Sequence, residues 1–318
     1  MEVIVGIDNI RKRLKNPAVT IGNFDGVHLG HRALFSKVKS WAEKLHGQSV
    51  VMTFNPHPLE FFRPGNGPAF ITTHERKLEL IGEAGIDVTI VVPFDETFAR
   101  TSATEFVEDL LVDRVGIKAI VVGHDYRFGR GREGDIDFLR RMGERYAFHV
   151  DAVSGIDVEG TVVSSTLIRQ CIHGGDLREA GRLLGRPYEI KGTVVSGRNR
   201  GARLLGFPTA NIEMANHAAP KRGIYAVQVD IDGRLHGGAA NLGYNPTFGD
   251  TALSLEVHIF DFNENIYGKR ITVRFIDRLR DEQKFSGPEE LAKQICRDVE
   301  RAREVLIRCS GLSPTESS

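Results

Sequence analysis

The chain has 318 residues, of which 41% are hydrophobic and 26% charged, an ordinary globular composition with enough length for two domains. Lys and Arg total 42 and Asp and Glu also total 42, so no overall charge favours a nucleic acid or an anionic membrane. Its 3 cysteines form no Cys-x-x-Cys pair, and no apolar run approaches the about 20 residues of a membrane span. We therefore expect a cytoplasmic protein, monomeric or weakly homo-oligomeric, with no nucleic-acid or membrane partner.

Residues 1–185 alternate short apolar runs with helical patterns, which is typical of an α/β domain with a mainly parallel sheet. The expected strands are residues 19–21, 49–54, 88–92, 119–122 and 148–153. Capping-box patterns at residues 72–75 and 102–105 predict two of the intervening helix starts.

The stretch 21–31 combines a glycine-rich turn with a helix start. Its glycines, at positions 22, 26 and 30, allow the backbone to pass close to a ligand. His28 and His31 are three residues apart and share one face of the first helical turn, which indicates a phosphate site. The alternatives are a helix cap with a half-buried core histidine, and a zinc site, which the absence of a nearby cysteine disfavours.

Two later stretches also point to ligands. Asp125 and Arg127 lie with two aromatic residues just after an apolar strand, where open α/β sheets bind ligands, so ring recognition is plausible there. Residues 163–169 open a helix with three hydroxyls and an arginine, a set that suits phosphate oxygens. These four residues are Ser164, Ser165, Thr166 and Arg169. An ordinary surface loop and simple helix capping are the respective alternatives.

Residues 129–134 spell Gly-x-Gly-x-x-Gly, the dinucleotide fingerprint of dehydrogenases, with Asp151 in the next expected strand. The fingerprint requires its first glycine in the turn directly after a strand, whereas here a loop intervenes. We therefore interpret the segment as a basic flexible loop.

Gly185 and Pro187 stop a helix. Beyond them, the spacing of the hydrophobic residues changes from the period of a helix to a period of two residues. Ile224, Ala226, Val229 and Ile231 lead to an Asp-Gly turn, and residues 253–260 alternate strictly. This pattern predicts a small antiparallel β-barrel. A capping box at residues 286–289 predicts the start of a final helix, which is expected to pack against the barrel. The polar tail from residue 311 is expected to be disordered.

Two features of this second half could carry chemistry. Thr209 and Asn211 face the same way in an extended segment and could join ATP phosphates around Mg²⁺, with a basic loop, residues 197–206, as a cover. Glu256 alternates away from the core-facing residues and could act as a general base. An ordinary turn, a basic surface loop and an exposed strand carboxylate are the structural alternatives.

At this point seven motifs, in order, resemble the bacterial bifunctional riboflavin kinase/FMN adenylyltransferases, also called FAD synthetases. They occupy residues 22–31, 53–58, 123–129, 164–169, 206–211, 241–249 and 255–262. The resemblance runs from about residue 18 to residue 305. Among these motifs the chain departs from the family at Tyr126, where Phe is more usual.

The resemblance implies a Rossmann-like FMN adenylyltransferase domain (1–185), a barrel-shaped riboflavin kinase domain (186–310) and a short tail (311–318). The second would convert riboflavin and ATP to FMN, with Thr209 and Asn211 holding Mg²⁺ and Glu256 as base. The first would join FMN to a second ATP, giving FAD and pyrophosphate, with His28 and His31 stabilising the phosphates. The remaining implied contacts are Asn23, Asp25, Ser164, Ser165, Thr166, Arg169, Gly197 and Arg200 for nucleotide, and Phe62, Asp125 and Arg127 for flavin.

A second class of function stays open alongside this one. A flavin- or nucleotide-binding regulatory module would keep the same binding residues and bind flavin without turnover.

Overall fold

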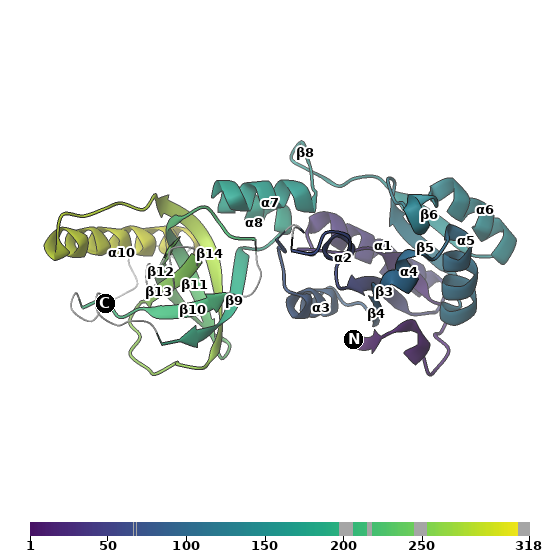
Figure 1. The fold of residues 1–318 in the computed structure, drawn as a ribbon, viewed down its shortest axis with the longest axis horizontal. Helices are drawn as coiled ribbons and strands as arrows, with labels where there is room; N and C mark the ends of the chain where they lie inside the picture. Colours follow the sequence, from purple (N-terminus) through teal and green to yellow (C-terminus); the bar gives the residue numbers. More distant parts are fainter. Residues whose placement is uncertain (66, 68, 197–205, 215–217, 245–252, 311–318) are drawn as a thin grey trace. The chain divides into compact units, whose positions relative to one another are not determined.

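A computed structural model of the chain describes all residues except 66, 68, 197–205, 215–217, 245–252 and 311–318, so the expected tail lies outside the described residues. The chain divides into two compact units, Met1–Ser165 and Thr166–Ser318 (Figure 1). The division comes in the first turn of helix α7 (Ser165–Gly174). The domain boundary expected at residue 185 stays a prediction.

The first unit is built on a six-stranded parallel sheet with the order β1-β4-β3-β2-β5-β6. Its strands are β1 (Glu2–Val5), β2 (Ala18–Ile21), β3 (Ser49–Asn55), β4 (Val88–Pro93), β5 (Ala119–Gly123) and β6 (His149–Val153). The five expected strands are confirmed. Strand β1 was not predicted, because it has four residues and buries only Ile4. A two-stranded hairpin, β7 (Asp157–Val158) and β8 (Thr161–Val162), follows the sheet.

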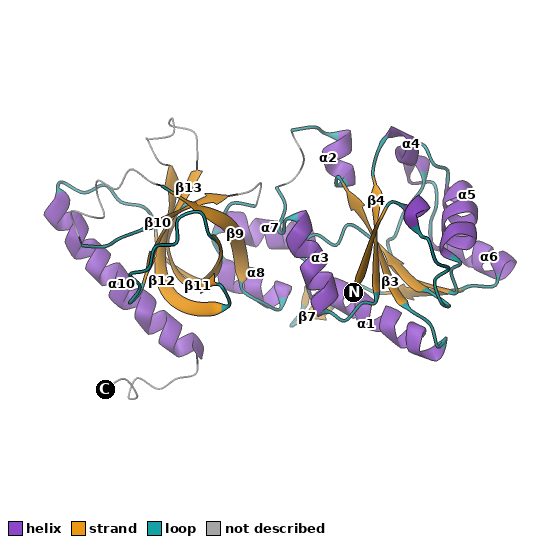
Figure 2. Cartoon of the chain, turned by 90° about the horizontal axis from the view of Figure 1, so that it is seen from below, coloured by secondary structure: helices purple, strands orange, loops and turns teal. Residues whose placement is uncertain are grey.

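Helices cover both faces of this sheet, as Figure 2 shows. They are α1 (Leu29–Lys44), α2 (Pro58–Phe62), α3 (His74–Glu83), α4 (Glu96–Ala99), α5 (Ala103–Glu105), the π-helix η2 (Phe106–Val115) and α6 (Ile136–Tyr146), with 3₁₀ turns η1 (Ile7–Asn9) and η3 (Arg130–Arg132). Val51 of β3 packs with Phe35 of α1 and Leu80 of α3. Its neighbour Met52 points to the other face and packs with the cluster that contains Leu111 and Leu139. The central strands are therefore buried on both sides, as parallel strands usually are.

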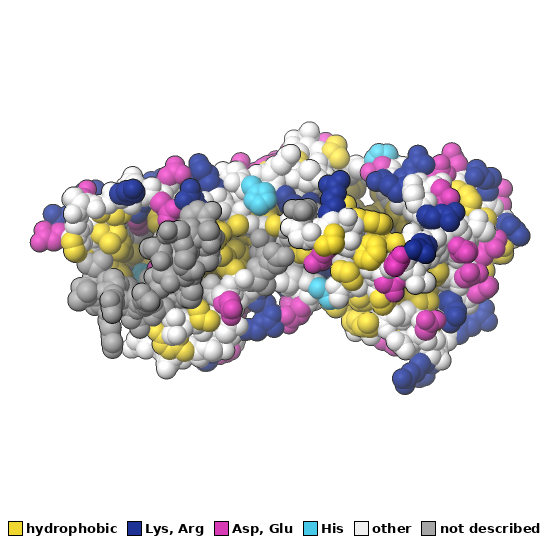
Figure 3. All heavy atoms as spheres, viewed as in Figure 1, with side chains coloured by type: hydrophobic (Ala, Val, Ile, Leu, Met, Phe, Trp, Pro, Cys, Tyr) yellow, Lys and Arg dark blue, Asp and Glu magenta, His cyan; other side chains and the backbone are white. Residues whose placement is uncertain are grey.

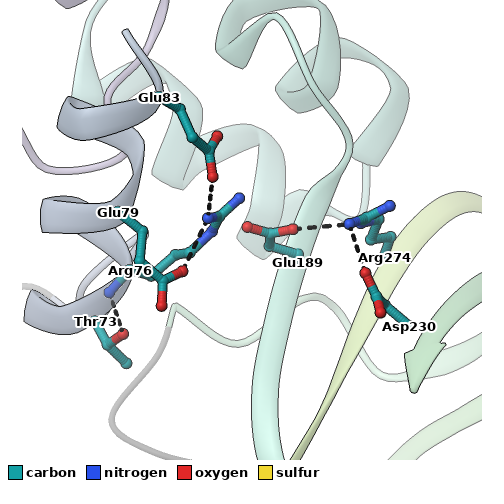
Figure 4. A network of polar contacts seen from close by, with 7 residues as sticks. All are labelled: Thr73, Arg76, Glu79, Glu83, Glu189, Asp230 and Arg274. Carbon is teal, nitrogen blue, oxygen red and sulfur yellow. Dashed lines mark hydrogen bonds and ion pairs between the residues drawn. The ribbon is translucent and has the colours of Figure 1, made fainter. Parts of the chain in front are cut away.

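The two capping boxes expected in this unit have different outcomes. Ser102 and Glu105 form a reciprocal box: Glu105 N donates to Ser102 Oγ over 3.2 Å, and Ser102 N donates to Glu105 Oε2 over 2.7 Å. The box at residues 72–75 was wrong by one residue, because Thr73 caps α3 by accepting from Arg76 N. Arg76 in turn pairs with Glu79 and Glu83 along the helix (Figure 4).

The second unit is a closed antiparallel barrel, as expected, preceded by α7 and α8 (Leu177–Leu184). Around the barrel the order is β10 (Ala210–Met214), β13 (Leu253–Ile259), β12 (Arg234–Tyr244), β11 (Gly223–Ile231), β14 (Arg270–Arg280) and β9 (Tyr188–Val195). Gly185 ends α8 with a φ of 70°. Asp232 and Gly233 form the expected two-residue turn with φ values of 52° and 84°.

Helix α10 (Pro288–Ser310) packs on the outside of the barrel, as expected. Ala226 of β11 and Phe260 belong to its contact cluster with Ala302, and Ile224 packs against the same cluster, so these two positions of β11 face α10. The expected capping box was also shifted, because Ser286 donates to Glu290 and not to Glu289. Elsewhere on the barrel, Arg274 links Glu189 and Asp230 (Figure 4).

Candidate active sites

The strand order places a ligand crevice at β2 and β5. From β2 the chain proceeds to β3 and β4 on one side, and β5 and β6 lie on the other, so the order reverses between β2 and β5. In open parallel sheets, ligands bind outside the carboxyl ends of the strands at such a point. Gly22 and Asn23 follow β2, and Asp125 follows β5. The topology therefore brings together two predicted motifs that are a hundred residues apart in sequence.

The turn after β2 has an unusual backbone. Phe24, Gly26 and Val27 have φ values of 49°, 84° and 41°. A positive φ is rare for residues with a side chain, and a genuine outlier for a β-branched residue such as valine. Gly26 is required here for a second reason, because a Cβ at this position would lie 3.0 Å from the Ile71 side chain. Strain of this kind persists only where the surroundings hold it, and it concentrates at functional sites.

His28 and His31 meet at the start of α1. His28 is the N-cap: its Nδ1 accepts a hydrogen bond from His31 N over 3.3 Å. The two rings stack with centroids 3.5 Å apart, and His28 is only 5% exposed. Because Nδ1 accepts, a neutral His28 carries its proton on Nε2, where it can be donated to a phosphate oxygen. The capping and ligand-binding interpretations of His28 are therefore compatible, since they use different nitrogens.

Asp25 anchors the turn to the loop before α3. Its buried carboxylate accepts from Ile71 N at 3.0 Å and from Thr72 N at 3.1 Å. Ser165 Oγ donates to the Asp25 carbonyl oxygen over 3.0 Å, which ties the first residue of α7 to the same turn. Both residues were predicted to bind nucleotide, but in this structure their side chains hold the turn in place.

Lys77 was missed by the sequence analysis, although it supports the same turn. Its ammonium group donates to Asn23 O and Thr53 Oγ1, both at 3.2 Å, and to Phe54 O at 3.4 Å. Burial lowers the pKa of Lys77 to about 8, and the negative charge of Asp25 opposes this shift. In the sequence, its signal is a lysine at a helix position that points toward the core. In the structure, Lys77 is 7% exposed.

An aromatic cavity of about 570 Å³ opens beside Asn23. The predicted flavin contacts Phe62, Asp125 and Arg127 all line it. Phe54, Phe94, Phe98 and Phe106 from neighbouring elements add apolar walls. Figure 3 shows hydrophobic side chains gathered on this face of the unit, over α2 and α4, with basic side chains beside them. An apolar cavity with a few polar groups suits a planar aromatic ligand.

The glycine-rich segment 129–134 is not a dinucleotide turn. Residues 124–128 separate it from β5, and Gly134 pairs with Phe128 through backbone hydrogen bonds. Helix α6 begins only after Asp135, which caps it. Trp41 Nε1 donates to Asp151, the acidic residue of the strand that follows, over 3.0 Å. Gly129 and Gly131 instead line the aromatic cavity.

In the second unit, Glu256 lies opposite Asn211 in the pairing of β13 with β10. Directly opposed residues of an antiparallel pair share a face of the sheet. Both side chains therefore stand on the outer face of the barrel, while Leu255 and Val257 are buried inside. Burial raises the pKa of the Glu256 carboxyl above its ordinary value.

Thr209 lies just before β10 and lines a cavity of about 390 Å³ at one end of the barrel. Asn211 does not line this cavity, so the described residues do not bring the two predicted metal ligands into one pocket. The Pro208 carbonyl lies 2.9 Å from His258 Nδ1, which fixes the backbone next to Thr209. The predicted nucleotide contacts Gly197 and Arg200 lie outside the described residues.

The comparisons with known proteins agree with this arrangement. A family model described as FAD synthetase matches residues 10–167, and one described as riboflavin kinase matches residues 184–306. The bifunctional riboflavin kinase/FMN adenylyltransferase of Pseudomonas fluorescens is 41% identical over 304 residues, covering 95% of this chain and 97% of that protein. The chain belongs to the bifunctional riboflavin kinase/FMN adenylyltransferase family. The Escherichia coli K12 protein of the same name is 40% identical over 306 residues, which cover 96% and 97% of the two chains.

A solved structure shares the fold over nearly the whole length. It is described as a macrolide-efflux protein from Streptococcus pneumoniae, and it aligns with a TM-score of 0.87 and 33% identity, covering 95% of this chain and 99% of that one. Its description concerns efflux, whereas the family models that match this chain concern flavin synthesis. Within the described part of this chain, no helix is long and apolar enough to cross a membrane.

Among the described residues, no group of three or more His, Cys, Asp or Glu side chains is placed to hold a metal. Mg²⁺ commonly keeps several waters and takes phosphate oxygens with one or two protein oxygens. The hydroxyl of Thr209 and the amide oxygen of Asn211 fit that chemistry, whereas the described residues do not form a zinc cage.

Proposed function

We propose that the two units catalyse the two family reactions with the residues described above. The C-terminal barrel phosphorylates riboflavin to FMN, and the N-terminal unit joins FMN to the AMP part of a second ATP. The observation that carries the N-terminal assignment is the meeting of the His28 turn and the Asp125 loop at the β2–β5 switch point. The C-terminal assignment is carried by the pairing of Glu256 with Asn211.

In the N-terminal unit the flavin ring occupies the aromatic cavity, against Phe62 and beside Asp125 and Arg127. An oxygen of the FMN phosphate attacks the α-phosphorus of ATP, the bond to the β-phosphate oxygen breaks, and pyrophosphate leaves. The attacking group is already an anion, so no protein nucleophile is needed and catalysis comes from positioning and charge stabilisation. His28 and His31 donate to the phosphate oxygens at the start of α1, where the helix dipole also favours negative charge.

Ser164 and Ser165 extend this phosphate site in the proposal. Ser165 donates to the Asp25 carbonyl oxygen, which holds it beside the turn. Thr166 and Arg169, the other two predicted nucleotide contacts in this stretch, fall in the second compact unit. Asn23, whose carbonyl is held by Lys77, contributes the edge nearest the flavin cavity.

In the C-terminal unit Glu256 takes the proton from the terminal hydroxyl of riboflavin, the hydroxyl oxygen attacks the γ-phosphorus of ATP, and ADP leaves. Thr209 and Asn211 hold Mg²⁺, which supplies charge neutralisation at the phosphates. The cavity beside Thr209 holds the nucleotide, and Gly197 and Arg200 contact it. A carboxylate whose pKa is raised by burial is a stronger base than an exposed one, which suits this role.

The experiment that tests the proposal follows both products in one tube. Purified protein is incubated with riboflavin, ATP and MgCl₂, and the flavins are separated over time. We expect FMN first and FAD afterwards, and loss of both when EDTA exceeds the metal. Tight binding of riboflavin or FMN without any new flavin would favour a regulatory module instead.

A further inference from the structure

Three polar side chains stand side by side on the outer face of the barrel. Glu256 of β13 lies opposite Asn211 of β10 on one side and opposite Asn241 of β12 on the other. Cβ atoms of directly opposed residues are about 4.5–5.5 Å apart in antiparallel pairs. Asn241 therefore neighbours the proposed base as closely as the proposed metal ligand Asn211 does.

The amide oxygen of Asn241 is shielded from solvent and has no hydrogen-bond partner among the described residues. Buried polar atoms are nearly always paired, so an unpaired one in a native site calls for an explanation. An ionised Glu256 cannot satisfy this oxygen, because a carboxylate only accepts hydrogen bonds. The amide oxygen of Asn241 therefore lacks a hydrogen-bond donor among the described residues.

We propose that Asn241 binds the sugar-alcohol chain of riboflavin by accepting a hydrogen bond from a hydroxyl near the one that reacts. This inference rests on the proposed kinase function of the C-terminal unit. A sugar-alcohol chain carries hydroxyls on successive carbons, and each offers an O–H donor. With the terminal hydroxyl at Glu256, a hydroxyl further along the chain reaches the adjacent strand and donates to Asn241. Asn241 thereby sets which carbon of the chain presents its oxygen to the base.

A different role would have a different kinetic signature. If Asn241 only oriented the Glu256 carboxylate, its removal would lower kcat and leave the KM for riboflavin unchanged. If it binds the substrate chain, its removal weakens riboflavin binding and leaves the KM for ATP unchanged. The two roles are therefore separated by one set of steady-state measurements.

The first test replaces Asn241 by Ala and, to keep the volume of the side chain, by Leu. We expect the KM for riboflavin to rise about 3- to 10-fold in Asn241→Ala, the range for one neutral hydrogen bond. Gln228→Ala is the matched control, because Gln228 carries an amide on the outer face of the neighbouring strand β11, opposite Arg274 rather than Glu256. Formation of FAD from added FMN by the same preparations reports whether each variant is folded. A fall in kcat with an unchanged riboflavin KM would overturn the inference.

The second test identifies the hydroxyl. Riboflavin analogues that each lack one inner hydroxyl are assayed with the unchanged protein and with Asn241→Ala. For one analogue, the loss in kcat/KM seen with the unchanged protein should disappear in the variant, since the partner is already gone. If every analogue lowers kcat/KM by the same factor in Asn241→Ala as in the unchanged protein, the proposed contact is contradicted. Failure of the kinase assignment itself looks different, because the unchanged protein would then form no FMN.

Discussion

His28 and His31 stack at the start of α1, and the Nδ1 of His28 caps the helix that carries His31. One imidazole therefore caps the helix with one nitrogen, and the proposed function assigns its other nitrogen, Nε2, to the phosphate. This division of tasks means that loss of the cap and loss of the ligand contact can be separated by choice of substitution.

The first prediction concerns His28. Asn is among the best N-cap residues and lacks an equivalent of Nε2, so His28→Asn should keep the helix and lose the phosphate contact. We expect FAD formation to fall about 100-fold or more, as on loss of one donor to a transition-state oxyanion. FMN formation should be unchanged. In His28→Ala the same loss should come with a melting temperature about 2–4 °C lower, from about 1 kcal/mol of lost capping. An active His28→Asn variant would remove His28 from the mechanism.

The second prediction concerns Glu256. Glu256→Gln keeps the shape and removes the base, so FMN formation should fall by about 10² to 10⁴-fold. FAD formation from added FMN should not change. Because the base acts when ionised, kinase kcat/KM should decline as the pH falls through the raised pKa of Glu256, above the usual pH for a glutamate. A variant that retains kinase turnover within threefold of the parent, as measured by flavin separation, would show that another group takes the proton.

The third prediction concerns the stability of the N-terminal unit at alkaline pH. The pKa of Lys77 is about 8 in the folded chain and ordinarily 10.5, so between these values the unfolded chain binds a proton that the folded chain has released. Lys77 therefore adds stability as the pH rises through this window, and this contribution is lost as the pH falls through 8. The slope is at most about 1.4 kcal/mol per pH unit.

Thermal melts from pH 7.5 to 10 check this prediction by difference. Lys77→Met has no titrating group, so its melting curve should lack the slope attributed to Lys77. Lys77→Arg serves where the Met variant folds poorly, because arginine keeps its charge throughout this range. Parallel pH dependences for the parent and both variants would mean that Lys77 titrates normally.

The fourth prediction concerns the aromatic cavity. Phe62 is 61% exposed and contacts Phe94, with ring centroids 5.7 Å apart. Phe62→Ala should raise the dissociation constant for FMN about 5- to 10-fold, because stacking is worth about 1 kcal/mol. Quenching of flavin fluorescence measures this binding. Val162→Ala is a matched control, since Val162 is also 61% exposed in the same unit and does not line the cavity. Equal FMN affinity in both variants would place the flavin elsewhere.

The sequence predicts the fold well where periodicity is strong. Strands β2 to β5 of the sheet and strands β11 and β13 of the barrel are long enough, or apolar enough, to define their own period. Strand β1 has four residues and one buried side chain, so its pairing with β4 depends on the finished sheet. The helix start at Thr73 was displaced by one because adjacent threonines offer equivalent capping patterns.

The residues of the candidate sites also differ in how far the sequence alone reveals them. His28 and Asp125 stand in local motifs that the sequence reveals. Lys77 and Phe94 carry no motif of their own and gain significance only through their place in the fold. Asn241 opens the motif at residues 241–249, but its position beside Glu256 follows only from the register of β12 with β13. Asp25 shows the converse, since its motif position indicates a ligand contact while its carboxylate holds a distant loop. The sequence shows which residue types stand in a motif, but it does not show which hydrogen bonds their side chains make within the fold.

The most direct test of the two-site account is a time course of flavins in a mixture of His28→Asn and Glu256→Gln proteins. Each variant alone, supplied with riboflavin, ATP and Mg²⁺, should fail to make FAD, the first stopping at FMN and the second leaving riboflavin unchanged. Mixed together, they should restore FAD formation after a lag while FMN accumulates. Absence of FAD from the mixture, under conditions where the Glu256→Gln protein converts added FMN, would contradict the assignment of the two reactions to separate sites.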